Sequence, residues 1–205
     1  MFEGSSIYFP LGKHFLNLEE VNFIEENLKK FPLEDITIGD AGEINDCQVG
    51  RLVEDHPETY PKQVNIEHST KLLEMFSSNK AQKFFDKFLS SKGIQTIRRC
   101  QFNLLKKGSF VGRHLDTDSN PDYEIACVLQ LGNAFEGGEF IVYPNKESQD
   151  CDAQVISPAF GSITISMCKV EHAVKEVIKG TRTSLVTFIS TYSGKNKRKK
   201  LAWNY

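Results

Sequence analysis

The sequence lacks any long apolar run, any strong charge imbalance and any closely paired cysteines. No apolar stretch approaches the roughly 18 residues that a membrane span requires, and the N-terminus lacks the basic, apolar and small-residue pattern of a secretory signal. The formal net charge of −2 gives no reason to expect nucleic acid or an anionic membrane as a partner. We therefore expect a cytoplasmic protein with no membrane-spanning segment.

The five cysteines are odd in number, scattered and without a CxxC pair. This pattern argues against a disulfide framework and against a zinc site made of thiolates. We expect most of them to be buried as small apolar side chains. They are Cys47, Cys100, Cys127, Cys151 and Cys168.

The 205 residues are 40% hydrophobic and 25% charged, which is enough for one buried core, so we expect one domain over residues 1–205. Residues 1–95 are predicted to form a helical support region. The first helix follows Asn17, a candidate N-cap with Glu20 as its capping-box partner. A second helical region is predicted over residues 69–93, broken around residues 77–79, and residues 34–67 indicate loops with a strand or two beside a main sheet.

Residues 96–192 carry short β-branched or aromatic runs separated by Gly, Pro, Asn and Asp. The pattern predicts an α+β protein, mainly β, whose second half is an antiparallel sandwich or barrel. Residues 193–205 form a basic C-terminal tail that contains Trp203, the only tryptophan. We expect this tail to be a solvated and partly mobile terminus in preference to a binding element.

One histidine and one aspartate stand two positions apart in the segment "GRHLDTDSNPDYE". If residues 110–116 form a strand, His114 and Asp116 project from the same face and can reach one ion. The alternative is a strand-end histidine followed by a turn aspartate. His172, after the apolar run "ITISM", would complete a set of two imidazoles and one carboxylate. Three protein ligands leave open positions that suit Fe(II), whereas a structural zinc site is normally closed by a fourth ligand.

Arg182 follows His172 by ten positions in the sequence. The Lys179-Gly180 pair predicts a hairpin turn that folds the strand of Arg182 back across that of His172. Arg182 and Ser184 would then share a face, where the guanidinium can hold a distal carboxylate. The alternative is a surface arginine, but the flanking "SLVTFIS" is apolar and favours a buried strand.

Several segments in a fixed order resemble the iron- and 2-oxoglutarate-dependent oxygenases, most closely their prolyl 4-hydroxylase-like branch. The segments are "HLD" at 114–116, "GGEF" at 137–140, "SPAFGSITIS" at 157–166 and "EHAVKEVIKGTRTSLVTFIS" at 171–190. The resemblance covers roughly residues 96–192. It implies a double-stranded β-helix, or jelly roll, as the catalytic core, supported by N-terminal helices.

The resemblance also implies roles for individual residues. His114, Asp116 and His172 would bind iron, with no catalytic residue beyond this metal centre, and Arg182, assisted by Ser184, would bind the C5 carboxylate of 2-oxoglutarate. The family often has a tyrosine nine positions before the first iron-binding histidine, but here that residue is Leu105. Either Gln101 or Asn103 replaces its contact with the co-substrate, or the co-substrate geometry differs.

The implied reaction is hydroxylation of an unactivated C–H bond, with decarboxylation of 2-oxoglutarate to succinate and CO₂. The cofactors would be Fe(II), 2-oxoglutarate and O₂, with ascorbate as a candidate reductant. Related halogenases replace the iron-binding carboxylate with a small residue, so an intact Asp116 favours hydroxylation. The candidate substrates are peptidyl proline or another peptidyl residue, a free amino acid, and a biosynthetic intermediate.

Arg113, Asp118 and Tyr123, together with Asp122 and Glu124, are candidate substrate contacts because they lie near the first ligands in sequence. The alternative is that they are solvated loop residues. Residues 117–124 and 144–153 are polar, rich in turn formers and candidate lids over the site.

Three other functions compete with that of a hydroxylase. A nucleic-acid demethylase of the same superfamily could use the basic tail, but it typically carries an arginine where Phe188 stands, so a nucleic-acid partner is not favoured. A non-catalytic metal-binding jelly-roll sensor would not need Arg182, and neither would a cupin-type metalloenzyme. The sequence gives no indication of the oligomeric state.

Overall fold

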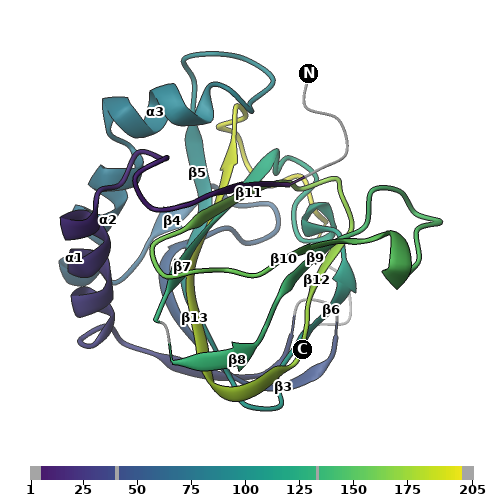
Figure 1. Cartoon of the computed structure of the whole chain (residues 1–205). Helices are drawn as coiled ribbons and strands as arrows, with labels where there is room; N and C mark the ends of the chain where they lie inside the picture. The colour runs from purple at the N-terminus through teal and green to yellow at the C-terminus, as the bar shows by residue number, and fades with distance from the viewer. Residues whose placement is uncertain (1–5, 40–41, 133, 200–205) are drawn as a thin grey trace.

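The computed structural model describes residues 6–39, 42–132 and 134–199. In these residues two antiparallel sheets face each other, and helices pack against the outer face of the larger sheet (Figure 1). The helices are α1 (Leu18–Leu28), α2 (Ile66–Phe76) and α3 (Asn79–Phe85). None of the helices in the described part of the chain is long and apolar enough to cross a membrane.

The larger sheet contains nine of the described strands, and the smaller one contains four. In spatial order the larger sheet consists of β1 (Ile7–Phe9), β11 (Ile163–Met167), β7 (Ile125–Leu131), β13 (Val177–Ser190), β5 (Thr96–Lys106), β3 (Ile44–Glu54) and β2 (Glu34–Ile38), with β4 (Lys62–Gln63) beside β3 and β8 (Phe135–Gly137) beside β13. The smaller sheet consists of β10 (Gln154–Ile156), β9 (Phe140–Val142), β12 (His172–Val174) and β6 (Val111–His114). Two 3₁₀ turns, η1 (Asp116–Asp118) and η2 (Asp150–Asp152), lie between strands. The predicted mainly-β jelly roll with N-terminal supporting helices is confirmed.

The first helix forms where the sequence predicts it. The Asn17 side chain accepts a hydrogen bond from the Glu20 amide at 2.9 Å, and the Glu20 carboxylate accepts one from the Asn17 amide at 2.8 Å. This capping box satisfies two amides that the helix itself leaves without partners. Val21 and Ile24 then turn the apolar face of α1 into the core.

The second helical region is broken as predicted, but it ends earlier than predicted. Ser78 caps α3 by accepting from the Ala81 amide, and α3 stops at Phe85. The helix does not continue to Gly93 because the chain turns here, and the Asp86 carboxylate accepts a hydrogen bond from the Gln95 side chain at 2.7 Å.

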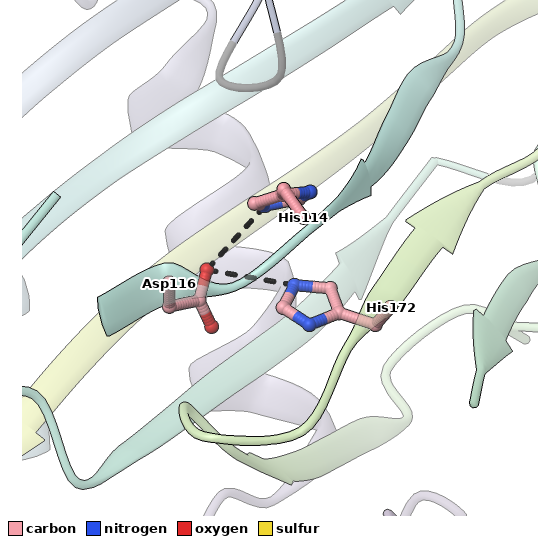
Figure 2. A group of neighbouring side chains, drawn as sticks. All are labelled: His114, Asp116 and His172. Carbon is pink, nitrogen blue, oxygen red and sulfur yellow. Dashed lines mark ion pairs between the residues drawn. The ribbon is translucent and has the colours of Figure 1, made fainter. Parts of the chain in front are cut away.

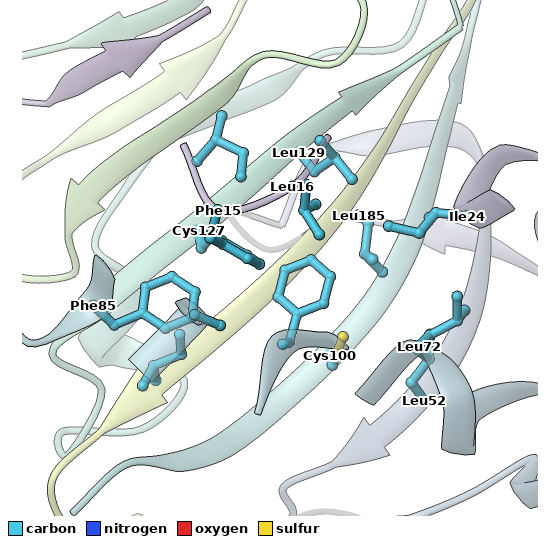
Figure 3. Packing of buried hydrophobic residues seen from close by; sticks show 14 of the residues in the cluster. Phe15, Leu16, Ile24, Leu52, Leu72, Phe85, Cys100, Cys127, Leu129 and Leu185 are labelled. Carbon is cyan, nitrogen blue, oxygen red and sulfur yellow. The ribbon is translucent and has the colours of Figure 1, made fainter. Parts of the chain in front are cut away.

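The core lies between the helices and the larger sheet (Figure 3). Side chains alternate between the two faces of a strand. On β5, β7 and β13 one face is mainly apolar and packs against the helices, with Cys100, Leu129 and Leu185 among its members. The opposite face of the same strands therefore points toward the smaller sheet, and it carries the polar residues described below.

Residues 1–95 are not helical throughout, because they also supply strands to the larger sheet. The expected strands in residues 34–67 are present, and β3 runs for 11 residues beside β5. The strand β1, which pairs with β11, was not predicted.

The predicted hairpin turn at Lys179-Gly180 is wrong. β13 runs continuously through these residues and changes partner from β8 to β5 and β7. Gly180 has a φ of +73°, and a Cβ there would lie 2.0 Å from the Ala134 carbonyl oxygen. Only glycine can make this close approach. Arg182 and His172 therefore lie on different sheets and not on neighbouring strands.

The predicted solvated tail is exposed at most of its described residues, but Asn196 docks against the rest of the chain. The Asn196 amide donates to the Thr59 carbonyl at 2.8 Å, and the Glu58 amide donates to the Asn196 carbonyl at 3.0 Å. Asn196 is only 1% exposed. Asn196 thus docks against the loop after β3, while Trp203 and the rest of the tail from residue 200 lie outside the described residues.

Candidate functional site

Three side chains converge between the two sheets (Figure 2). His114 ends β6 and His172 begins β12, and the two are direct partners in the antiparallel register of these strands. The predicted strand does not extend to Asp116, because β6 stops at His114 and Asp116 opens η1. The turn still brings the Asp116 Oδ1 atom to 3.6 Å from His114 Nε2 and 3.5 Å from His172 Nε2.

Hydrogen bonds to backbone carbonyls fix both imidazole rings. Nδ1 of His114 lies 2.8 Å from the Gly112 carbonyl oxygen, and Nδ1 of His172 lies 2.9 Å from that of Val170. A carbonyl oxygen can only accept, so each Nδ1 carries the proton. In the neutral rings the lone pair is then on Nε2, the atom that faces Asp116 and would bind a metal.

The Asp116 carboxylate is buried and still favours its charged form. Burial alone raises its pKa, but without a metal the positive charge of a protonated His172 and hydrogen bonds from the protonated Nε2 atoms of both imidazoles outweigh burial and hold the pKa below its ordinary value. Its Oδ2 atom has no hydrogen-bond partner among the described residues. Two nitrogen donors and one carboxylate oxygen, all within 4.8 Å of one another, fit a ferrous ion that keeps open coordination positions.

A cavity of about 350 Å³ opens beside these three side chains, and Arg182 lines it from the larger sheet. The Arg182 side chain is 4% exposed, and its Nε has no partner in the described part of the chain. Burial lowers its pKa to about 10, which still leaves it charged at neutral pH. A buried guanidinium without a counter-ion is costly, so this group is suited to an anion that enters the cavity, such as a carboxylate of 2-oxoglutarate.

Ser184, Asn103 and Gln101 also line the cavity, as does Leu105. In the register of β13 with β5, Arg182 lies opposite Leu105 and Ser184 lies opposite Asn103. Of the two proposed substitutes for the family's tyrosine, Asn103 is therefore one row from Arg182 and Gln101 is two rows away. The Gln101 amide donates to Asn103 Oδ1 at 2.6 Å, which orients the Asn103 side chain.

Arg113 points away from the cavity. Its guanidinium donates to the Glu171 carboxylate and to the Ser148 carbonyl oxygen at 2.8 Å, and it stacks over the Tyr143 ring at 4.0 Å. These contacts hold the loop of residues 144–153. Arg113 thus has a structural role in place of the predicted contact with substrate.

Tyr123 is buried, 1% exposed, and its ring stacks on Phe188 with 4.6 Å between centroids. It does not line the cavity, so it too has a structural role. The Glu124 carboxylate accepts hydrogen bonds from the amides of Ser90 and Thr191 and is likewise structural. Asp118 is exposed on η1 outside the cavity lining, and its contact with substrate stays a prediction.

Arg99 and Arg51 line the cavity and were not singled out from the sequence. The signal that could have identified Arg99 is the alternation along β5. Positions 99, 101, 103 and 105 face the cavity, whereas positions 100 and 102 face the helices. Once Gln101 and Asn103 are assigned to the site, a period of two places Arg99 on the same face.

Comparison with known proteins agrees with this geometry. A 36% identical structure from Burkholderia pseudomallei, described as an oxidoreductase of the 2OG-Fe(II) oxygenase family, superposes with a TM-score of 0.86 and covers 94% of this chain and 88% of that one. A prolyl 4-hydroxylase from Pseudomonas putida is 17% identical (TM-score 0.61, 92% of each chain), and a prolyl hydroxylase from Trichoplax adhaerens is 15% identical (TM-score 0.61, 92% and 84%). These two similarities show the fold alone.

Residues 100–190 match the family model of the 2OG-Fe(II) oxygenase superfamily. No curated protein sequence matches the chain. The relative from Burkholderia, the matched segment and the His-Asp-His set agree with one another. The chain therefore belongs to the 2OG-Fe(II) oxygenase superfamily, whose enzymes use Fe(II), 2-oxoglutarate and O₂.

Proposed function

We propose that the protein hydroxylates an unactivated C–H bond of an amino-acid-like substrate and converts 2-oxoglutarate to succinate and CO₂. One observation carries the proposal. The set of His114, Asp116 and His172 lines the same cavity as the buried guanidinium of Arg182, whose Nε has no hydrogen-bond partner among the described residues. This combination supplies a metal site and an anion site from two facing sheets.

In this proposal each polar side chain has a defined task. His114, Asp116 and His172 hold the iron, and Arg182 holds the distal carboxylate of 2-oxoglutarate in a bidentate pair. Ser184 donates its hydroxyl to the same carboxylate, and the Asn103 amide takes the place of the missing tyrosine. When bound, iron and 2-oxoglutarate supply the activation of O₂ and the oxidation of a C–H bond.

The retained carboxylate of Asp116 supports hydroxylation in preference to halogenation. In the halogenases of the superfamily a small residue at this position makes room for chloride. Asp116 is buried, and its Oδ1 faces both imidazoles. The coordination position that chloride would need is therefore taken by the protein.

The test is anaerobic reconstitution with Fe(II) and 2-oxoglutarate, followed by visible spectroscopy of the weak charge-transfer band. We expect the band in the wild type, its loss in His172→Ala and its retention in Asp118→Ala, since Asp118 is exposed outside the cavity. An O₂-dependent succinate assay with ascorbate, run against peptides and free amino acids, then tests turnover. A band that survives His172→Ala would overturn the assignment of the ligands.

A further inference from the structure

Three polar side chains follow one another along the cavity face of β5. Arg99, Gln101 and Asn103 stand two positions apart, so they project from the same face of the strand, and all three line the cavity. Arg99 Nε donates to Gln101 Oε1 at 2.8 Å, and Gln101 Nε2 donates to Asn103 Oδ1 at 2.6 Å. The three side chains thus form a row of hydrogen bonds that runs along the strand and ends at Asn103.

Arg99 sets the direction of this row. A guanidinium has only donors, whereas a side-chain amide has donors at one end and an acceptor at the other. The end of Gln101 that meets Arg99 must therefore be its oxygen, which leaves its NH₂ group to meet Asn103. Asn103 must in turn present its oxygen to Gln101. The NH₂ group of Asn103 is then the end that remains for a ligand in the cavity.

The surroundings of the row oppose the reverse direction. Gln101 is 4% exposed, so it depends on its protein partners for hydrogen bonds. Turning its amide round would place its NH₂ group against the Arg99 donor and break that hydrogen bond. The Arg99 guanidinium also lies over the Phe188 ring, 5.8 Å from the ring centroid, and this contact helps to hold it in place.

The row ends beside Arg182. In the register of β13 with β5, Asn103 lies opposite Ser184, and Arg182 lies opposite Leu105. Asn103 and Arg182 are therefore diagonal neighbours on one face of the sheet. Such neighbours are about 7–8 Å apart, within reach of long side chains. One carboxylate between them can accept hydrogen bonds from both.

We propose that Arg99 and Gln101 are positioning residues, which fix the Asn103 side chain as a hydrogen-bond donor to the distal carboxylate of 2-oxoglutarate. The inference rests on the proposed function and deepens its account of the co-substrate site. Asn103 and Arg182 then offer only donors to the ligand. A carboxylate has only acceptors, so this wall of the cavity is complementary to it.

The first experiment reverses the row by exchanging an NH₂ group for an oxygen. Gln101→Glu keeps an acceptor for Arg99 but removes the donor that faces Asn103. The Asn103 amide then has to turn, so that its NH₂ group donates to the introduced carboxylate and its Oδ1 atom meets the co-substrate. We expect the Kd for 2-oxoglutarate, measured anaerobically from the visible band of the Fe(II) enzyme, to rise about 10- to 100-fold. A rise below threefold would overturn the inference.

Asn103→Ala supplies the control for the negative charge that Gln101→Glu adds. This variant has no amide to turn, so in its background Gln101→Glu should change the Kd for 2-oxoglutarate less than threefold. An equal rise in both backgrounds would mean that the added charge repels 2-oxoglutarate directly, and it would refute the role of the row.

The second experiment tests whether Arg99 sets the direction. Arg99→Lys keeps a group that can only donate, so the Kd for 2-oxoglutarate should stay within threefold of the wild-type value. Arg99→Glu presents an acceptor, so both amides should turn and the Kd should rise about as much as in Gln101→Glu, except in the Asn103→Ala background. Equal Kd values in Arg99→Lys and Arg99→Glu would refute the role of Arg99. Absence of the band in the wild type would instead refute the proposed function itself.

Discussion

Gly138 lies against Arg182. A Cβ at Gly138 would come within 2.6 Å of Arg182 Cδ, and the residue has a φ of +68°. The absence of a side chain therefore lets Arg182 occupy its place in the cavity wall. This gives the second glycine of the "GGEF" segment a positioning role beyond the tight turn.

We predict that Gly138→Ala displaces Arg182 and raises the KM for 2-oxoglutarate about 10- to 100-fold, since misplacement of a binding group by about 1 Å can cost 100-fold. The effect on kcat should be smaller, because Arg182 does not touch the metal. Steady-state kinetics with varied 2-oxoglutarate separates the two constants.

Gly108→Ala is the matched control. Gly108 also has a positive φ, +87°, but a Cβ added there would meet no atom within 4 Å. It carries the same backbone strain without the collision. A similar rise in KM in both variants would show that strain, and not contact with Arg182, is responsible.

At the scale of elements, a buried network joins four segments. Arg98 on β5 donates from Nε and Nη2 to the Asp55 carboxylate, each at 3.0 Å, and Arg98 Nη1 reaches the Tyr192 and Gly194 carbonyls. Asn120, in the loop after η1, donates to the same carboxylate at 2.6 Å. The loop that begins with the ligand Asp116 is thus tied to β5, to the loop after β3 and to the C-terminal segment.

Asp55→Asn should destabilise the protein by about 3–5 kcal/mol, because it leaves the Arg98 charge buried without its counter-ion. Both side chains of the pair are 0% exposed. Urea unfolding measures the free-energy change. Glu136→Gln is the control, because it breaks the Lys179–Glu136 pair, whose side chains are 72% and 62% exposed, and exposed pairs contribute little. An equal loss of unfolding free energy in Asp55→Asn and Glu136→Gln would contradict this account.

Glu124 links the turn after α3 with the end of β13. Burial alone raises its pKa, but hydrogen bonds from Ser90 and Thr191 outweigh it and lower the pKa from 4.5 to about 2. A lowered carboxyl pKa stabilises the fold above the unfolded value of 4.5, and this contribution disappears as the pH falls toward 2. Glu124→Gln should therefore be less stable than the wild type at pH 7, with a difference that shrinks below pH 4.5.

Urea unfolding of both proteins between pH 7 and pH 3 tests this prediction. A difference that stays constant across the range would mean that Glu124 does not act through its charge.

The elements differ in how far their sequence determines them. The positions of the four central residues of the site could be predicted because the segments that contain them resemble, in a fixed order, those of a known family, and α1 could be predicted because its cap is local. The continuous course of β13 through Gly180 could not be predicted, since glycine occurs equally in hairpin turns and at close approaches within a strand. The strand β1 was missed because its partner β11 lies more than 150 residues away in sequence.

At the scale of the whole molecule, ligands should stabilise the fold in two separable steps. A ligand that binds only the folded state raises the free energy of unfolding by RT ln(1 + [L]/Kd), which is about 2.7 kcal/mol when the free ligand concentration is 100 times Kd. For a chain of this length that is a rise in Tm of about 5–10 °C. We expect one step with Mn(II), as a redox-stable substitute for Fe(II), and a second with 2-oxoglutarate, measured anaerobically by thermal denaturation.

Two variants assign the steps. In His172→Ala the metal should no longer raise Tm. In Arg182→Gln the metal should still raise Tm, but 2-oxoglutarate should not raise it further. If Arg182→Gln retained the second step, Arg182 would not be the carboxylate site.

The pairing of His114 with His172 has a consequence for the smaller sheet. β6 has four residues and lies at the edge of that sheet, where β12 is its only partner strand in the described chain. A metal ion held by both histidines would act as a cross-link between the two strands. Because a slip of one residue would turn one ring to the opposite face, only the correct alignment can be cross-linked. Amide protons of β6 should accordingly exchange with solvent more slowly once the ion is bound.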